Sequence, residues 1–140
     1  MIYLATNNEI SQGQLLIDDL THIKTKIITD LESQTIVHCI HKASAIYING
    51  GWVNIHPNTY LTAGESQNPL PLIDAIDIPF SPNKHFYSNT MEIKRFTLLF
   101  PAIPASWKKF SLIEEAGTEN GFIVTDILRN NLGVYHVTLI

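Results

Sequence analysis

Apolar and polar residues alternate along much of the chain, and a period of two is typical of half-buried β-strands. The clearest case is MEIKRFTLLF, residues 91–100, in which Phe96, Leu98 and Phe100 fall on one face. Near the end of the chain, Tyr135, Val137 and Leu139 share a face in the same way. The pattern predicts strands in the following segments: 21–29, 35–42, 43–48, 52–57, 59–63, 91–100, 121–129 and 134–140.

Two turns are expected to join neighbouring strands into hairpins. Asn49, Gly50 and Gly51 separate two apolar runs, and both residue types tolerate a positive φ, so a tight hairpin is expected there. The segment 130–133, NNLG, has the same character and predicts a second hairpin that includes the last strand.

The segment FPAIPASWKKF leaves the strand that ends at Phe100. Pro101 cannot donate to a strand ladder, so the strand is expected to stop before it. Two interpretations follow for Trp107 and Phe110. We favour a structural corner, in which both aromatic side chains fold back over the open end of the core. The alternative is an exposed ligand clamp.

Helical signals are few. Residues 9–20 could form a turn or two, and residues 105–117 could form a short helix with Ser106 as its N-cap. Residues 67–83 contain four of the seven prolines and predict meandering edge structure. Short strands at turn spacing with little helix indicate an all-β fold: an antiparallel β-sandwich of about seven to nine strands, with residues 1–140 as a single domain. A closed barrel is the alternative.

Composition narrows the function classes. Charged residues are 16% of the chain and the net charge is −4, so no basic excess favours nucleic acid as a partner. No apolar run reaches the length of about 20 residues that a membrane span requires. The first residues, MIYLATNNEIS, lack the basic start of a signal peptide. The compartment is therefore unknown, and would be the periplasm or cell envelope if a signal has been removed.

No catalytic or metal-binding motif stands out. His38 and His41 lie three apart on one predicted strand and face opposite sides, so they cannot bind one metal ion by themselves. We expect a partly buried, hydrogen-bonded His38 and a solvated His41. Cys39 lies in an apolar strand and is expected to be inert. Completing a metal site would require histidines from elsewhere in the fold: His56, His85 or His136.

The sequence predicts no cofactor and no catalytic residue. Asp74, Asp77 and Asn83 could bind calcium in a loop, but no glycine-spaced calcium motif is present, and turn-capping is the favoured role of these side chains. There is no G-x-S-x-G motif and no glycine-rich phosphate loop before a helix.

Aromatic residues are the candidates for a binding surface. Trp52, Tyr60 and Trp107 are the residues we single out, and Tyr47 and Phe86 could join Trp52 and Tyr60 in a groove for a sugar or a peptide. The alternative, which we favour for Trp52, is that it is the core tryptophan of a sandwich.

The chain resembles the immunoglobulin-like β-sandwich module that is common in envelope and secreted proteins of Bacteroidota, often ahead of a thioredoxin-like domain. The resemblance rests on the order and spacing of several short segments between residues 35 and 127: TIVHC, GGWVNIHPNTYL, FTLLFPAIP, FSLIEE and GFIVTDI. The thioredoxin-like domain and its C-x-x-C motif are missing from this sequence. The module implies no catalytic residues.

Three hypotheses for the function follow. The first is a non-catalytic module that binds a protein or a cell-surface component, for example by adding a strand at a sheet edge. The second is a small hydrolase-like enzyme with histidines and carboxylates that converge in space. The third is a structural protein that oligomerises edge to edge. The sequence does not define the oligomeric state.

Overall fold

The computed structural model of the protein describes residues 34–64, 67–117 and 121–139. The strand expected at 21–29 and the helical turns expected at 9–20 lie outside the described residues. The described part contains ten strands and no helix, which confirms the all-β prediction. The strands are β1 (Gln34–Lys42), β2 (Trp52–Val53), β3 (Thr59–Thr62), β4 (Leu70–Pro71), β5 (Asp74–Ile76), β6 (His85–Phe86), β7 (Ile93–Pro101), β8 (Lys109–Glu114), β9 (Ile123–Leu128) and β10 (Val134–Leu139).

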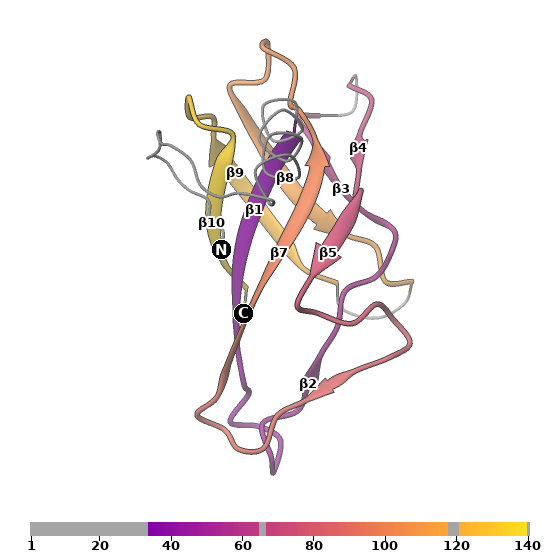
Figure 1. The fold of residues 1–140 in the computed structure, drawn as a ribbon, viewed down its shortest axis with the longest axis vertical. Helices are drawn as coiled ribbons and strands as arrows, with labels where there is room; N and C mark the ends of the chain where they lie inside the picture. Colours follow the sequence, from indigo (N-terminus) through magenta and orange to yellow (C-terminus); the bar gives the residue numbers. More distant parts are fainter. Residues whose placement is uncertain (1–33, 65–66, 118–120, 140) are drawn as a thin grey trace, which may run out of the picture. The chain divides into compact units, whose positions relative to one another are not determined.

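The strands form two four-stranded sheets and one two-stranded ribbon (Figure 1). The first sheet has the order β10-β1-β7-β5, the second has the order β4-β3-β8-β9, and β2 pairs with β6. Every pair of strands is antiparallel except β1 and β10, which run parallel. The prediction of purely antiparallel sheets is therefore wrong at this one pair. A parallel partner for β1 must enter from the same end, so the chain has to cross the molecule before β10 begins.

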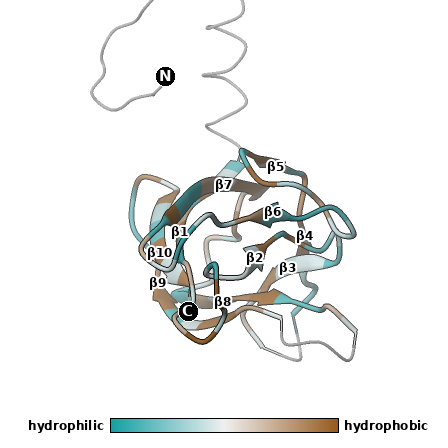
Figure 2. Ribbon diagram, turned by 90° about the horizontal axis from the view of Figure 1, so that it is seen from below, coloured by the Kyte–Doolittle hydropathy of each residue, from teal (hydrophilic) through white to brown (hydrophobic). Residues whose placement is uncertain are grey.

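The two larger sheets lie face to face and enclose one apolar core (Figure 2). The alternation in the sequence explains which faces are buried. Phe96, Leu98 and Phe100 of β7 are all buried, as the sequence predicts. In β1, Val37 and Cys39 point into the same core. The other buried apolar residues are Val53, Ile55, Leu61, Ile78, Tyr87, Ile103, Trp107, Phe110, Leu112, Tyr135 and Leu139.

The segment after β7 is a corner, as favoured from the sequence. Ile103 and Trp107 are buried, and Phe110 is only 2% exposed. The Ile103 amide donates to Thr35 Oγ1 over 3.1 Å, which fixes the corner to the start of β1. The strand extends one residue further than expected, because Pro101 still opposes Gln34 at the edge of the ladder.

The short helix expected over 105–117 is wrong, since residues 109–114 form β8. The sequence KFSLIE has inward positions every second residue, at Phe110, Leu112 and Glu114, and this period of two belongs to a strand. The capping signal at Ser106 instead lies in the turn in which the Trp107 amide donates to the Pro104 carbonyl.

The first expected hairpin is also wrong. Residues 43–51 form an irregular loop, and β2 pairs with β6 instead of with a strand in that loop. The conformational part of the prediction is confirmed, because Gly50 and Gly51 have φ values of 89° and 83°. A residue pair that permits a turn does not decide which strands the turn connects.

The second expected hairpin fails for a related reason. β9 lies in the second sheet and β10 lies in the first, so residues 129–133 carry the chain from one sheet to the other. The buried face of the last strand is as expected, with Tyr135 and Leu139 in the core. The proline-rich segment 67–83 contains β4 and β5, which are edge strands of different sheets, and this confirms the prediction of meandering edge structure.

Candidate functional site

The ribbon of β2 and β6 presents an exposed aromatic pair. Trp52 and Phe86 are directly opposite each other in the ladder and are 47% and 67% exposed. The ammonium nitrogen of Lys84 lies 4.6 Å from the centre of the Trp52 ring, a cation–π contact. The prediction of a buried Trp52 is therefore wrong. Side chains alternate along a strand, and here the register turns Val53 into the core and Trp52 outward.

The loop of residues 43–51 and the loop of residues 87–92 lie at the same end of the sheets as β2 and β6 (Figure 1). The Ala43 amide donates to the Glu92 carbonyl over 2.9 Å, and the Tyr87 amide donates to the Gly51 carbonyl over 3.0 Å. These bonds hold the loop of residues 43–51 beside the chain that follows β6. We call the exposed apolar residues of this region the apolar end: Ile46, Tyr47, Ile48, Trp52, Phe86 and Met91, each at least 47% exposed.

The other two aromatic candidates lie elsewhere. Tyr60 is half-buried in β3, and its hydroxyl donates to the Glu115 carboxylate over 3.2 Å. Trp107 is buried in the corner after β7, and its indole N–H donates to Gln67 Oε1 over 3.4 Å. The structure thus places Trp52, Tyr47 and Phe86 in one region and keeps Trp107 in the core.

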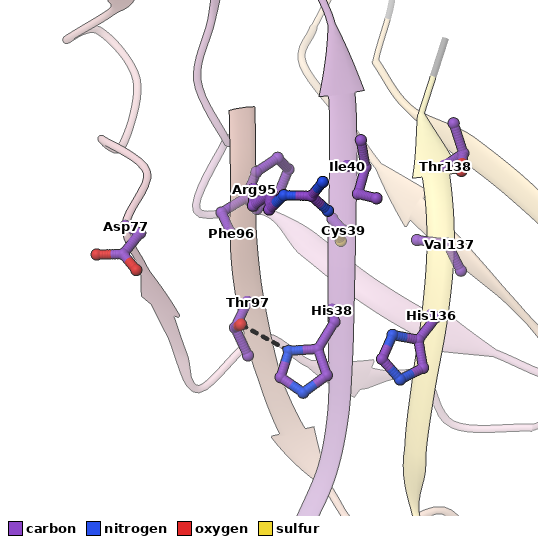
Figure 3. Close-up of a pocket in the computed structure, with 10 residues that line it drawn as sticks. All are labelled: His38, Cys39, Ile40, Asp77, Arg95, Phe96, Thr97, His136, Val137 and Thr138. Atoms are coloured by element: carbon purple, nitrogen blue, oxygen red, sulfur yellow. Dashed lines mark hydrogen bonds between the residues drawn. The ribbon is translucent and has the colours of Figure 1, made fainter. Parts of the chain in front are cut away.

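The outward face of the first sheet holds a second group of polar side chains. His38 of β1 has Thr97 of β7 on one side and His136 of β10 on the other, in register with both. The two imidazole rings stand side by side with their centres 5.1 Å apart (Figure 3). His38 Nδ1 lies 2.8 Å from Thr97 Oγ1. Asp77 and Arg95 line the same shallow hollow, whose volume is about 350 Å³.

Desolvation by the surrounding residues and the charge of the neighbouring His136 lower the pKa of His38. His41 faces the other side of β1 and is half-buried, with Nδ1 2.7 Å from the Tyr87 hydroxyl, which itself donates to the His41 carbonyl. Burial lowers the pKa of His41 too. The side chain of His38 is exposed and that of His41 is half-buried, so the expected burial of the two histidines is reversed, although His38 does form a hydrogen bond.

Glu114 is a buried carboxylate that sequence reasoning missed. Its Oε2 accepts from the His56 amide over 2.7 Å, and its Oε1 accepts from the Phe122 amide over 3.0 Å. Burial raises the pKa of Glu114, while the two backbone hydrogen bonds oppose the rise. The signal in the sequence was its inward register two residues after Leu112. With both oxygens occupied by backbone donors, the role of this carboxylate is structural.

The remaining chemical candidates are separate from one another. Cys39 is 1% exposed, and burial raises the pKa of its thiol to about 12, which agrees with the expected inert thiol. Asp74 accepts a hydrogen bond from the amide of Ala75, and Asp77 lines the hollow beside His38. Among the described residues, no three His, Cys, Asp or Glu side chains converge on a point where a metal ion would fit.

The described residues include no helix with the length and apolar character needed to traverse a membrane. The chain matches no protein-family model, and comparisons with curated proteins and with solved structures find no similar protein.

Proposed function

We propose that the protein is a non-catalytic binding module and that the apolar end binds a protein partner. The observation that supports this proposal is the exposed Trp52–Phe86 pair, which is fixed by backbone pairing and flanked by further exposed apolar side chains. Contiguous apolar surface of this kind is typical of interaction sites, and tryptophan and tyrosine are enriched among the residues that contribute most to binding.

The charges beside the apolar end define the chemistry of the partner. Lys84 and Lys42 are both exposed in this region, and Lys84 already lies over the Trp52 ring. The one carboxylate among the neighbouring loop residues, Glu92, accepts a hydrogen bond from the Ser88 amide. A partner with apolar side chains surrounded by acidic groups would therefore be complementary in both respects.

The proposed fold family is the immunoglobulin-like β-sandwich of bacterial envelope and secreted proteins. Two four-stranded sheets around one core support it, as do β1 and β9, which form in two of the segments that carry the resemblance, TIVHC and GFIVTDI. The parallel pairing of β1 with β10 is a departure from a purely antiparallel arrangement. A partner at the cell surface would agree with such a module.

The test is site-specific photo-crosslinking with the full-length chain. A photoreactive residue at position 86 should capture a protein from the native lysate, and the same residue at position 123 on β9 should not. Ile123 is a matched control because it is 66% exposed, as Phe86 is at 67%, but lies in another strand. The captured protein is then purified and titrated.

In that titration, Trp52→Ala should weaken binding by about tenfold or more, which corresponds to about 1.4 kcal/mol, while Ile123→Ala should bind like the unmodified protein. Equal binding by Trp52→Ala and the unmodified protein would refute the assignment of the apolar end. Capture at position 123 alone would show that the partner binds at β9 and not at the apolar end.

A further inference from the structure

We propose that His38 and His136 together bind a divalent transition-metal ion of the late first row, such as Zn²⁺, Cu²⁺ or Ni²⁺, on the outward face of the first sheet. This site is independent of the apolar end. It rests on three features of the described residues: the separation of the two rings, the hydrogen bond that orients one of them, and the exposure of both.

The separation suits two ligands of one ion. When the donor nitrogens of two imidazole rings both point at the ion, zinc–nitrogen bonds of about 2.0–2.1 Å at a tetrahedral angle place the ring centres about 5.2 Å apart. The rings of His38 and His136 have their centres 5.1 Å apart and stand on the same face of the sheet (Figure 3). The strand register keeps the two residues adjacent, because they are direct partners in the β1–β10 ladder.

Thr97 orients one of the two ligands. When the Nδ1–H of His38 donates to Thr97 Oγ1, over 2.8 Å, the lone pair of the ring is on Nε2, which is the nitrogen left for a metal ion. Histidines that bind metals in proteins commonly donate their other ring N–H to an oxygen in this way, and such contacts fix both the tautomer and the ring orientation.

The donor set selects the metal. Imidazole nitrogen suits zinc, copper and nickel, whereas calcium and magnesium require a shell of oxygen ligands. Both histidines are exposed, so water can fill the remaining coordination positions. Asp77 and Arg95 line the hollow with opposite charges, so they add no net charge of either sign.

A bound ion would link the first and last strands of the described residues. β1 and β10 are adjacent in the sheet, and their parallel pair joins segments about one hundred residues apart in the sequence, from Gln34 to Leu139. A ligand that requires both strands in place binds the folded chain and not the unfolded one. Binding therefore raises the melting temperature as the metal concentration rises.

The experiment uses the full-length chain without an affinity tag that contains histidine. ZnCl₂ is titrated by calorimetry, and melting is followed at increasing ZnCl₂ concentrations. We expect a binding event that either His38→Gln or His136→Gln weakens by about tenfold or more. Thr97→Val should weaken it by about tenfold, because the orienting oxygen is lost while both ligands remain. His85→Gln is the control, since His85 lies on β6, away from the first sheet.

Nitrogen-15 spectra of the imidazole groups provide a readout that a purely structural role would not change. Zinc should shift the Nε2 resonance of His38 and a ring nitrogen of His136 together, and leave the His85 nitrogens unchanged. Retained zinc affinity in the His38→Gln/His136→Gln double variant overturns the proposal. So does a loss of binding in His85→Gln equal to that in either single variant, since it would locate the ion elsewhere.

Discussion

At the scale of single residues, Glu114 shows how a charged group comes to lie inside a β-protein. Its two oxygens each accept one backbone N–H, from His56 in the connection before β3 and from Phe122 before β9. The carboxylate thus joins two connecting segments and accepts hydrogen bonds from backbone amides that strand pairing does not satisfy. An amide cannot replace it, because an amide has only one oxygen and its NH₂ group would face a second donor.

Glu114→Gln should therefore lower the free energy of unfolding by about 1–3 kcal/mol, the range for a buried donor left without an acceptor. Urea unfolding measures this change. Asp126→Asn is the matched control, since Asp126 is exposed and its contact with Lys109 spans 3.5 Å between exposed groups. The control should stay within about 0.5 kcal/mol of the unmodified protein. Equal stability of the two variants would mean that the Glu114 contacts contribute nothing.

His41 makes the stability depend on pH. Burial lowers its pKa in the folded protein from the ordinary value of 6.5, so the unfolded chain takes up a proton at a higher pH than the folded chain does. Above pH 6.5 His41 makes its full contribution to the free energy of unfolding. This contribution decreases as the pH falls through the pKa of the folded state.

Urea unfolding at several values between about pH 8 and about pH 5.5 tests this dependence. His41→Asn retains a donor near the Tyr87 hydroxyl and lacks the titrating ring, so its stability should fall less over this interval. A variant that loses stability on acidification as steeply as the unmodified protein would assign the dependence to other groups. Glu114 acts in the opposite direction at lower pH, because its raised pKa favours the protonated folded form.

At the scale of elements, the corner between β7 and β8 depends on its aromatic anchors. Phe110 is 2% exposed, and its ring meets the Tyr135 ring edge to face. Phe110→Ala should lower the free energy of unfolding by about 3–5 kcal/mol, a large share of the stability of a typical domain. Lys108→Ala and Lys109→Ala remove exposed side chains and should remain within about 0.5 kcal/mol of the unmodified protein. Thermal melts compare the three, and a Phe110→Ala melt like that of the lysine variants would favour the exposed clamp.

The loop of residues 43–51 depends on a glycine with no free space around it. Gly50 has a φ of 89°, and a Cβ there would lie 2.4 Å from the Asn89 carbonyl oxygen. Gly117 has a comparable φ of 72° and nothing within 4 Å of the same position. Gly117→Ala should thus lower the free energy of unfolding only by the conformational cost of about 1–2 kcal/mol. Gly50→Ala should lower the free energy of unfolding by about 1–3 kcal/mol more, because the loop around Gly50 must move away from Asn89. Equal losses in urea unfolding would contradict the close approach.

The sequence was informative about strands and poor at pairing them. β1, β3 and β7 lie in segments that were predicted to be strands, and the inward positions of β7 were predicted correctly. The two hairpins were not, because a glycine with positive φ serves a loop as well as a turn between paired strands. Pairing depends on contacts between residues far apart in the chain, such as Trp52 with Phe86, and no local signal encodes them.

At the scale of the described domain, the candidate sites arise from these long-range pairings. His38 and His136 become neighbours because β10 joins β1 in parallel, and the aromatic pair forms because β2 meets β6. The sequence named Trp52 and Phe86 as aromatic candidates, but their register decided that Trp52 faces outward. It also named His136 among the histidines able to approach His38, without any means of choosing it over His56 or His85.

The two sheets of the described domain meet where Phe110 of β8 packs against Tyr135 of β10. Their ring centres are 5.0 Å apart and the planes are inclined at 87°, an edge-to-face contact. A double-mutant cycle with Phe110→Leu and Tyr135→Leu isolates this contact, because leucine keeps much of the buried volume and removes the aromatic geometry. We expect a coupling free energy of about 0.5–1.5 kcal/mol in urea unfolding.

The matched control is a cycle between Phe110→Leu and His38→Asn. His38 lies on the outward face of the first sheet, so it shares no contact surface with Phe110 in the core. The two changes should therefore add to within about 0.3–0.5 kcal/mol. If the Phe110–Tyr135 cycle is equally additive, the sheets do not depend on each other at this point. A clear coupling would show instead that the last strand, which no hairpin ties to β9, is held in the fold through its core contact with the opposite sheet as well as through its pairing with β1.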